Sequence, residues 1–253
     1  MLPAERKRSI QEIIQNEKKV YVNSLSILFN VTDETIRKDL EKLEQDGILT
    51  RTYGGALLNI DQAREDPSFF ERTKKNLEAK KIIAYKMLPY IEDGFTIMAD
   101  SSSTVLETLK LCKQTGKKNL TIVTNSIEVL NTLVSSSVNI ILTGGTFSYN
   151  SMSLVGSLSE DAINKYTVDI ALISCKGFDI NQGFTDSNEC EIKIKKAMIK
   201  QAHKTFLLID SSKLRKVSFI KLLESNKLDY VVSDKDPDSD FIEFFNNNDI
   251  EFI

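Results

Sequence analysis

The sequence has 253 residues, 41% of them hydrophobic and 27% charged, and a formal net charge of −3. These values are typical of a soluble globular protein of one or two domains, and the net charge argues against a protein that coats nucleic acid without specificity. The chain has no apolar run as long as a membrane span and no charged-then-apolar segment at its start, and its three cysteines are far apart with no Cys-x-x-Cys pair, so we expect a cytoplasmic protein without a disulfide framework or a cysteine zinc site.

The first 58 residues predict three helices followed by a β-hairpin. Apolar residues recur at helical spacing over 6–15 and 22–29. In the third helix, Ile36, Leu40 and Leu43 fall at i, i+4 and i+7, which is one face of a helix. We expect this helix to end at the Asp46-Gly47 pair. A strand over 48–53, a turn at Gly54-Gly55 and a return strand over 56–58 are expected to follow. This order predicts a winged helix-turn-helix domain over residues 1–58.

The third helix has the side chains that DNA recognition needs. Thr32 is a plausible N-cap, and Thr35, Arg37 and Lys38 point away from the apolar face. A helix with hydroxyl and guanidinium groups near its N-terminal end can place that end in the major groove, and Arg51 on the hairpin is placed to contact a phosphate. The alternative is a small helical bundle with no DNA-binding role.

A specific resemblance adds to this pattern. It is carried by the run Phe29-Asn30-Val31-Thr32-x-x-Thr35-Ile36-Arg37-Lys38-Asp39-Leu40-x-x-Leu43-Glu44-x-x-Gly47-x-Leu49-x-Arg51-x-x-Gly54-Gly55-Ala56. The run resembles the N-terminal signature of the DeoR family of bacterial transcriptional repressors. That family usually has a second arginine where Lys38 stands and a histidine where Tyr53 stands. The resemblance implies that double-stranded operator DNA is bound by Thr32, Thr35, Arg37, Lys38, Arg51 and Tyr53.

Residues 59–75 are polar and charged and are expected to form a linker, and residues 76–253 a second domain. A long helix is predicted over 69–88. Strands and helices then alternate. The strands are expected at 96–99, 120–123, 139–142, 168–173, 205–209 and 230–232, and the helices at 104–112, 127–134, 158–166, 189–202 and 241–246. This alternation of apolar strands with helices predicts an α/β domain with a mostly parallel sheet.

Polar residues follow five of these strands, at 100–104, 124–126, 143–145, 174–178 and 210–213. Ligands of parallel sheets bind beyond the carboxyl ends of the strands. The hydroxyl run at 101–104 opens a helix, where free N–H groups favour an anion, and Lys213 adds a point charge. Asp100 and Asp210 could accept hydrogen bonds from sugar hydroxyls. Each feature alone also has a structural explanation, as an N-cap, a turn or a solvated lysine, but together they predict a phosphorylated-sugar site.

The second domain carries its own resemblance. The motifs are Asp100-Ser-Ser-Ser-Thr104, Thr124-Asn125-Ser126, Gly144-Gly145, Val155-Gly156, Gly183-Phe184-Thr185-Asp186, Glu189 and Asp210-Ser211-Ser212-Lys213. They are similar to the effector domain of the DeoR family, which resembles ribose-5-phosphate isomerase in fold. The resemblance implies that the effector is bound by Asp100, Ser101, Ser102, Ser103, Thr104, Thr124, Asn125, Gly144, Gly145, Lys176, Gly177, Glu189, Asp210 and Lys213.

The sequence also weighs against an enzyme. His203 is the only histidine, so no histidine-based triad or histidine-rich metal site can form, and its predicted place at a helix end suits a structural role. Asp186, Glu189 and Glu191 could serve as a base, which keeps a sugar-phosphate isomerase as the alternative. We expect a repressor of a carbohydrate operon that forms a homodimer or homotetramer, is released from DNA by a phosphorylated sugar, and needs no cofactor or metal.

Overall fold

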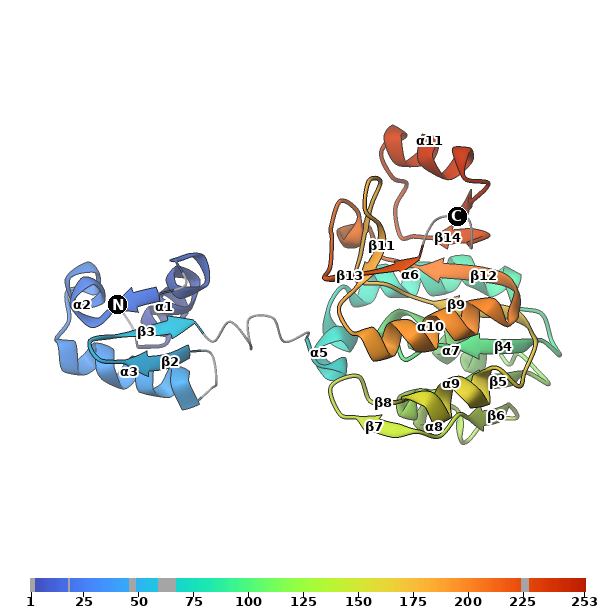
Figure 1. The fold of residues 1–253 in the computed structure, drawn as a ribbon, viewed down its shortest axis with the longest axis horizontal. Helices are drawn as coiled ribbons and strands as arrows, with labels where there is room; N and C mark the ends of the chain where they lie inside the picture. Colours follow the sequence, from blue (N-terminus) through green and yellow to red (C-terminus); the bar gives the residue numbers. More distant parts are fainter. Residues whose placement is uncertain (1–2, 18, 46–48, 59–66, 224–227) are drawn as a thin grey trace. The chain divides into compact units, whose positions relative to one another are not determined.

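A computed structural model describes residues 3–17, 19–45, 49–58, 67–223 and 228–253. The chain divides into two compact units, Met1–Asp66 and Pro67–Ile253, and each is treated by itself below (Figure 1). Residues 67–75 therefore fold with the second unit, although the sequence placed them in the linker. The predicted helix end at Asp46-Gly47 and most of the predicted linker lie outside the described residues. None of the described helices is long and apolar enough to cross a membrane.

The described part of the first unit has the predicted order of helices and hairpin. Its elements are α1 (Pro3–Glu17), β1 (Lys19–Tyr21), α2 (Val22–Phe29), α3 (Asp33–Gln45), β2 (Leu49–Thr52) and β3 (Gly55–Leu58). The hairpin strands β2 and β3 pair antiparallel, and β1, which the sequence did not predict, pairs with the other edge of β3. The winged helix-turn-helix prediction is thus confirmed, with an added short strand.

The apolar faces of these helices form one core. Ile10 and Ile14 of α1 are buried against Ile36, Leu40 and Leu43 of α3, all at 1% exposure or less. One charged pair shares this interior. Arg6 on α1 donates from Nε to Asp39 on α3 at 2.6 Å, and both side chains are only 7% exposed. Because α3 is held from behind by this core, its opposite face is exposed to solvent.

The described residues of the second unit form a seven-stranded sheet in which every neighbouring pair is parallel, with the order β15-β14-β12-β9-β4-β5-β6. The strands are β4 (Thr96–Ala99), β5 (Thr121–Thr124), β6 (Asn139–Leu142), β9 (Val168–Ile173), β12 (Ala202–Leu208), β14 (Tyr230–Val232) and β15 (Glu251–Phe252). The parallel α/β prediction is confirmed. The five strands with polar residues after them are β12, β9, β4, β5 and β6, which are consecutive neighbours in the sheet.

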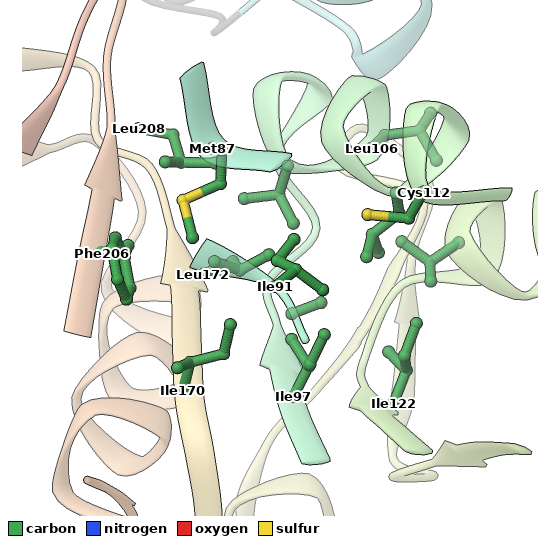
Figure 2. Close-up of a cluster of buried hydrophobic side chains, with 14 of the residues drawn as sticks. Met87, Ile91, Ile97, Leu106, Cys112, Ile122, Ile170, Leu172, Phe206 and Leu208 are labelled. Atoms are coloured by element: carbon green, nitrogen blue, oxygen red, sulfur yellow. The ribbon is translucent and has the colours of Figure 1, made fainter. Parts of the chain in front are cut away.

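Helices cover both faces of this sheet (Figure 1). The helices on the first face are α6 (Leu77–Met87), α7 (Ser103–Gln114) and α8 (Ile127–Leu133). Figure 2 shows their core, in which Met87 and Leu106 lie with side chains such as Ile97, Ile170 and Phe206 from three strands. The central strands β4, β5 and β9 are buried along most of their length, as expected when a sheet is covered on both faces.

The second face is covered by α9 (Ser157–Ile163) and α10 (Glu189–Lys200). Beside them a smaller antiparallel sheet and α11 (Ser239–Asn247) enclose a second core that is rich in phenylalanine. Other elements of this unit are β7 (Thr146–Ser148), β8 (Ser153–Val155), β10 (Gly177–Asp179), β11 (Gly183–Asp186), β13 (Ile220–Leu223) and the short 3-10 turn Ser211–Lys213. The sequence did not predict the antiparallel strands β7, β8, β10, β11 and β13.

The single helix predicted over 69–88 is wrong. The structure has α5 (Phe69–Lys74), then α6, then a 3-10 turn over Leu88–Tyr90. Asn76 breaks the helix because it adopts a left-handed conformation with φ of 52°, which asparagine tolerates better than most residues. The prediction that His203 ends a helix is also wrong, because α10 stops at Lys200 and His203 lies in β12.

Candidate effector site and DNA-binding surface

The exposed face of α3 carries the side chains that were predicted to read DNA. Arg37 and Lys38 are exposed, and Lys38 lies 4.0 Å from Glu34 one turn earlier. Thr32 precedes the helix, and its hydroxyl accepts from the Thr35 backbone N–H at 3.3 Å and lies 2.9 Å from the Thr35 hydroxyl. Thr32 thus acts as the helix cap, and Thr35 is engaged with it.

Arg51 joins the hairpin to α3. Its backbone N–H and its Nε donate to the two carboxylate oxygens of Glu44, at 2.8 and 2.7 Å. These two bonds, the backbone one first, hold the pKa of Glu44 below its ordinary value. The carboxylate therefore fixes the direction of the Arg51 side chain at the surface, while Tyr53 stands fully exposed at the turn of the hairpin.

The second unit has a cavity of about 220 Å³ beyond the carboxyl ends of β4, β9 and β12. We call it the basic cavity. Its described lining residues are Pro67, Arg72, Lys75, Asn76, Lys80, Ser102, Ser103, Thr104, Ser174, Cys175, Lys176, Asp186, Lys195, Asp210, Ser212, Lys213 and Lys216. Seven of these described residues are lysine or arginine and two are aspartate, so the cavity favours an anion.

A buried lysine, Lys80, and a half-buried one, Lys213, contribute to this charge. Lys213 donates to the Ser174 hydroxyl at 2.9 Å, and Lys80 donates to the backbone carbonyls of Arg72 and Lys75. Burial, followed by the positive charge of Lys213, lowers the pKa of Lys80 to about 8, and burial lowers the pKa of Lys213 as well. A bound anion would relieve the repulsion between these two ammonium groups.

The start of α7 forms another wall of the basic cavity. Ser102 caps the helix by accepting from the Val105 backbone N–H at 3.3 Å, and Ser103 and Thr104 line the cavity. The first backbone N–H groups of a helix have no partners within it, and they point toward the positive end of the helix dipole. This arrangement provides hydrogen-bond donors for a phosphate group.

Two carboxylates at this edge are paired with a buried lysine. The Lys195 ammonium lies 2.6 Å from Asp186 and 3.5 Å from Asp100, and it also donates to the Ser174 carbonyl. Burial opposes the charge on Lys195, but Asp186, Asp100 and Glu191 outweigh it and raise the pKa of the ammonium. Burial likewise disfavours ionised Asp186, yet Lys195 brings its pKa below the ordinary value. A carboxylate locked in this way is a poor general base.

Asp100 fixes the shape of the edge. Its two oxygens accept from the backbone N–H groups of Ser102 and Ser174, at 2.9 and 3.0 Å, and its side chain is 1% exposed. It therefore ties the β4 loop to the β9 loop and does not line the basic cavity. Asp210 does line it, with one oxygen accepting from Asn76 and Ser212.

The predicted effector residues divide into two groups. Those that line the basic cavity are Ser102, Ser103, Thr104, Lys176, Asp210 and Lys213. Those that do not line it are Asp100, Ser101, Thr124, Asn125, Gly144, Gly145, Gly177 and Glu189. The effector role of this second group stays a prediction.

The loops after β5 and β6 hold the β7–β8 hairpin, which explains why they miss the cavity. The side-chain Nδ2 of Asn125 donates to the Leu154 carbonyl at 3.0 Å, and the backbone carbonyl of Asn125 accepts from the Leu154 N–H. Gly145 has φ of 117°, and a Cβ there would lie 2.7 Å from the Val155 carbonyl oxygen. Glu189 is exposed and pairs with Lys193 at 3.1 Å.

Several lining residues were not predicted from the sequence, chiefly Arg72, Lys75, Asn76, Lys80 and Lys195. A signal for two of them was present. Lys80 and Lys195 each share a helix face with buried apolar residues. A lysine inside an apolar stripe is rarely buried unless it is paired, so its position indicates a polar partner in the interior.

The comparisons with known proteins agree with this architecture. The profile of the DeoR-like helix-turn-helix domain matches residues 6–62, and that of the DeoR C terminal sensor domain matches residues 75–235. The chain belongs to the DeoR family. This DeoR-family protein is thus a transcriptional regulator with a DNA-binding domain and a sensor domain, and the alternative of an isomerase is set aside.

Individual relatives cover nearly the whole of this DeoR-family chain. The HTH-type transcriptional regulator YulB of Bacillus subtilis is 37% identical over 92% of this chain and 90% of its own length. The L-fucose operon activator of Haemophilus influenzae is 34% identical over 97% of each chain. Among solved structures, a D-ribose-5-phosphate isomerase in complex with phospho-erythronic acid matches with a TM-score of 0.41 and 20% identity, over 55% of this chain and 54% of that one.

Proposed function

We propose that this DeoR-family regulator controls a carbohydrate operon and that a phosphorylated sugar in the basic cavity changes its affinity for the operator. The observation that carries this proposal is the cavity itself, in which lysines and a helix N-terminus converge while Asp210 remains available for hydroxyl groups. A phosphate satisfies the cations, and a sugar moiety satisfies the carboxylate and the serine hydroxyls.

The regulator binds the operator as a homodimer or homotetramer in the cytoplasm, with one reading helix in each half-site. Repression is the proposed sign, because blocking a promoter requires only DNA binding, whereas activation also requires a contact with the polymerase. One relative is named an activator, so a test must be able to return either sign. The effector shifts the population only by its differential affinity for the DNA-binding and released forms.

A panel of pentose and hexose phosphates, each with its unphosphorylated sugar, tests the proposed ligand class by thermal shift. A ligand that binds the native state selectively raises the melting temperature by mass action. We expect at least one phosphorylated sugar to raise it and its unphosphorylated partner to leave it unchanged. The active compound is then added to a gel-shift titration with operator DNA. A panel in which no phosphorylated compound binds would contradict the proposal.

Lys213→Ala is expected to weaken binding of the active sugar phosphate by about tenfold to a hundredfold, because a hydrogen bond to a charged group is lost from a buried site. Isothermal titration calorimetry measures the loss. Operator binding without effector should be unchanged, so the variant should bind DNA and ignore the effector. Lys204→Ala is the control, since Lys204 lies exposed near the opposite end of β12. Wild-type effector affinity in Lys213→Ala would count against the site.

Arg37→Ala is expected to weaken operator binding by about 1–3 kcal/mol if the guanidinium reads a base. A gel-shift titration on the operator and on unrelated DNA of the same length separates two roles. A base contact is lost only from the operator, whereas a phosphate contact is lost from both DNAs equally. Equal wild-type affinity on the operator would refute any contact by Arg37.

A further inference from the structure

The segment 67–80 closes one side of the basic cavity. Arg72, Lys75, Asn76 and Lys80 line the cavity together with residues from the carboxyl ends of β4, β9 and β12. None of these four residues belongs to the strand-end loops where ligands of parallel sheets usually bind. In the chain, this segment comes immediately after residues 59–66, which connect it to the DNA-binding unit.

Arg72 is held at the cavity with an unused donor. Its carbonyl accepts from Lys80 and, at 3.3 Å, from the Ser103 hydroxyl, and its guanidinium carbon lies 5.6 Å from the centre of the Phe69 ring. Phe69 is 1% exposed, so the guanidinium lies against a fixed ring. Arg72 Nε is buried and has no hydrogen-bond partner among the described residues. A buried donor without a partner is uncommon in folded proteins, and this one can donate to a bound ligand.

Asn76 connects this segment to the opposite wall. Its left-handed backbone precedes α6 as the N-cap residue, and its Nδ2 donates to Asp210 Oδ1 and to the Ser212 hydroxyl, both at 2.9 Å. The Lys80 ammonium donates hydrogen bonds to the backbone carbonyls of Arg72 and Lys75. The end of α5 and the loop after β12 are therefore already joined without a ligand, and Arg72 faces the space between them.

We propose that Arg72 donates to the phosphate of the effector and that the effector thereby fixes α5 against the strand-end loops. This inference rests on the proposed function of the cavity. A planar guanidinium suits a phosphate because it can donate two parallel hydrogen bonds. Since α5 is the first helix after residues 59–66, its restraint is the step by which ligand binding acts on the part of the chain that leads to the DNA-binding unit.

Phosphate binding by the full-length protein tests the first half of the inference. Inorganic phosphate is titrated by calorimetry against chloride at equal ionic strength. Arg72→Ala is expected to weaken phosphate binding by about tenfold to a hundredfold, and Arg72→Lys, which keeps the charge and loses Nε, by less. Lys74→Ala is the matched control, because Lys74 lies exposed on the same helix and does not line the cavity. If Arg72→Ala bound phosphate with wild-type affinity while Lys213→Ala bound it more weakly, the inference about Arg72 would be overturned and the proposed cavity site would stand. If the wild-type protein bound no phosphate, the cavity would be overturned as a phosphate site as well.

Amide hydrogen exchange tests the second half. Phosphate should slow exchange over residues 69–74 in the wild type and in Lys74→Ala, and this protection should be absent in Arg72→Ala at a phosphate concentration that saturates the variant. Melting temperature and circular dichroism establish that each variant is folded, and Arg72→Lys provides a second reading if Arg72→Ala is not. Protection of residues 102–106 without any change over 69–74 would contradict a role for α5.

Discussion

Lys195→Met is expected to destabilise the sensor unit by about 3–5 kcal/mol, because it leaves Asp186 and Asp100 as buried carboxylates without their cation. The side chain of Lys195 is 6% exposed and those of both aspartates are 1% exposed, so solvent compensates little of the charge on the carboxylates. Urea titration read by hydrogen exchange reports the sensor unit separately from the DNA-binding unit. The expected loss is a large part of the 5–15 kcal/mol typical of a folded protein.

The control for this variant is on the same helix. Lys193→Met removes an exposed lysine that pairs with Glu189 and should change stability little. If the two methionine variants were equally stable, Lys195 would not be the cation that compensates the buried carboxylates.

The loss in Lys195→Met should become smaller at low pH. In the wild type the pKa of Asp186 is lowered, so its contribution is complete above the unfolded pKa near 4 and declines as pH falls below it. In the variant, burial without Lys195 raises the pKa of this carboxyl, so the folded state gains stability as protons bind. The two stability curves should therefore approach each other on acidification, and parallel curves would contradict the ion-pair explanation.

Arg6→Met is expected to unfold a large fraction of the DNA-binding unit and thereby to abolish most operator binding. The Arg6–Asp39 pair connects α1 to the back of α3, and both side chains are 7% exposed. Removing one partner of a buried pair costs about 3–5 kcal/mol, and domains of about 60 residues have little stability to lose. Hydrogen exchange of α3 and a gel-shift titration on the operator measure the two effects.

A second substitution separates loss of the pair from loss of its arginine. Replacing both partners, as Arg6→Met with Asp39→Leu, should restore most of the stability because no buried charge is left alone. Arg215→Met is the surface control, since Arg215 forms an exposed pair with Asp238 and Asp240 and should change stability little. If the double variant were as unstable as Arg6→Met, packing and not charge would explain the effect.

The sequence predicted most of the fold because its strongest patterns are local. Ile36, Leu40 and Leu43 mark α3, and all three are buried as the helical spacing requires. The strand over Val168–Ile173 was predicted with the bounds that the structure has. Short antiparallel strands such as β7 and β10 were missed because three residues carry too little periodicity. The break at Asn76 was missed because helical patterns continue on both sides of it.

The site was predicted less completely than the fold, for a physical reason. A parallel sheet places its strand ends in one row, so Ser102 and Lys213 could be assigned to the cavity by position alone. The order of the strands does not show which strand-end loops border an open cavity and which are covered by other segments of the chain. The β7–β8 hairpin packs against Asn125 and Gly145 and occupies the space beside them. Arg72 approaches from outside the row, so no strand-end argument could find it.

The residues that line the basic cavity are spread over much of the chain. This spread affects the order in which the DNA-binding unit and the cavity form during synthesis. The buried core of the DNA-binding unit ends at Ala56, whereas the cavity draws on residues from Pro67 to Lys216. On the ribosome, the operator-binding module can therefore fold while most of the polypeptide is still to be translated, and its contacts are local enough for this to be fast. The basic cavity is complete only after β12 has joined β9, so under the proposed function a chain cut short before that point would have no effector site.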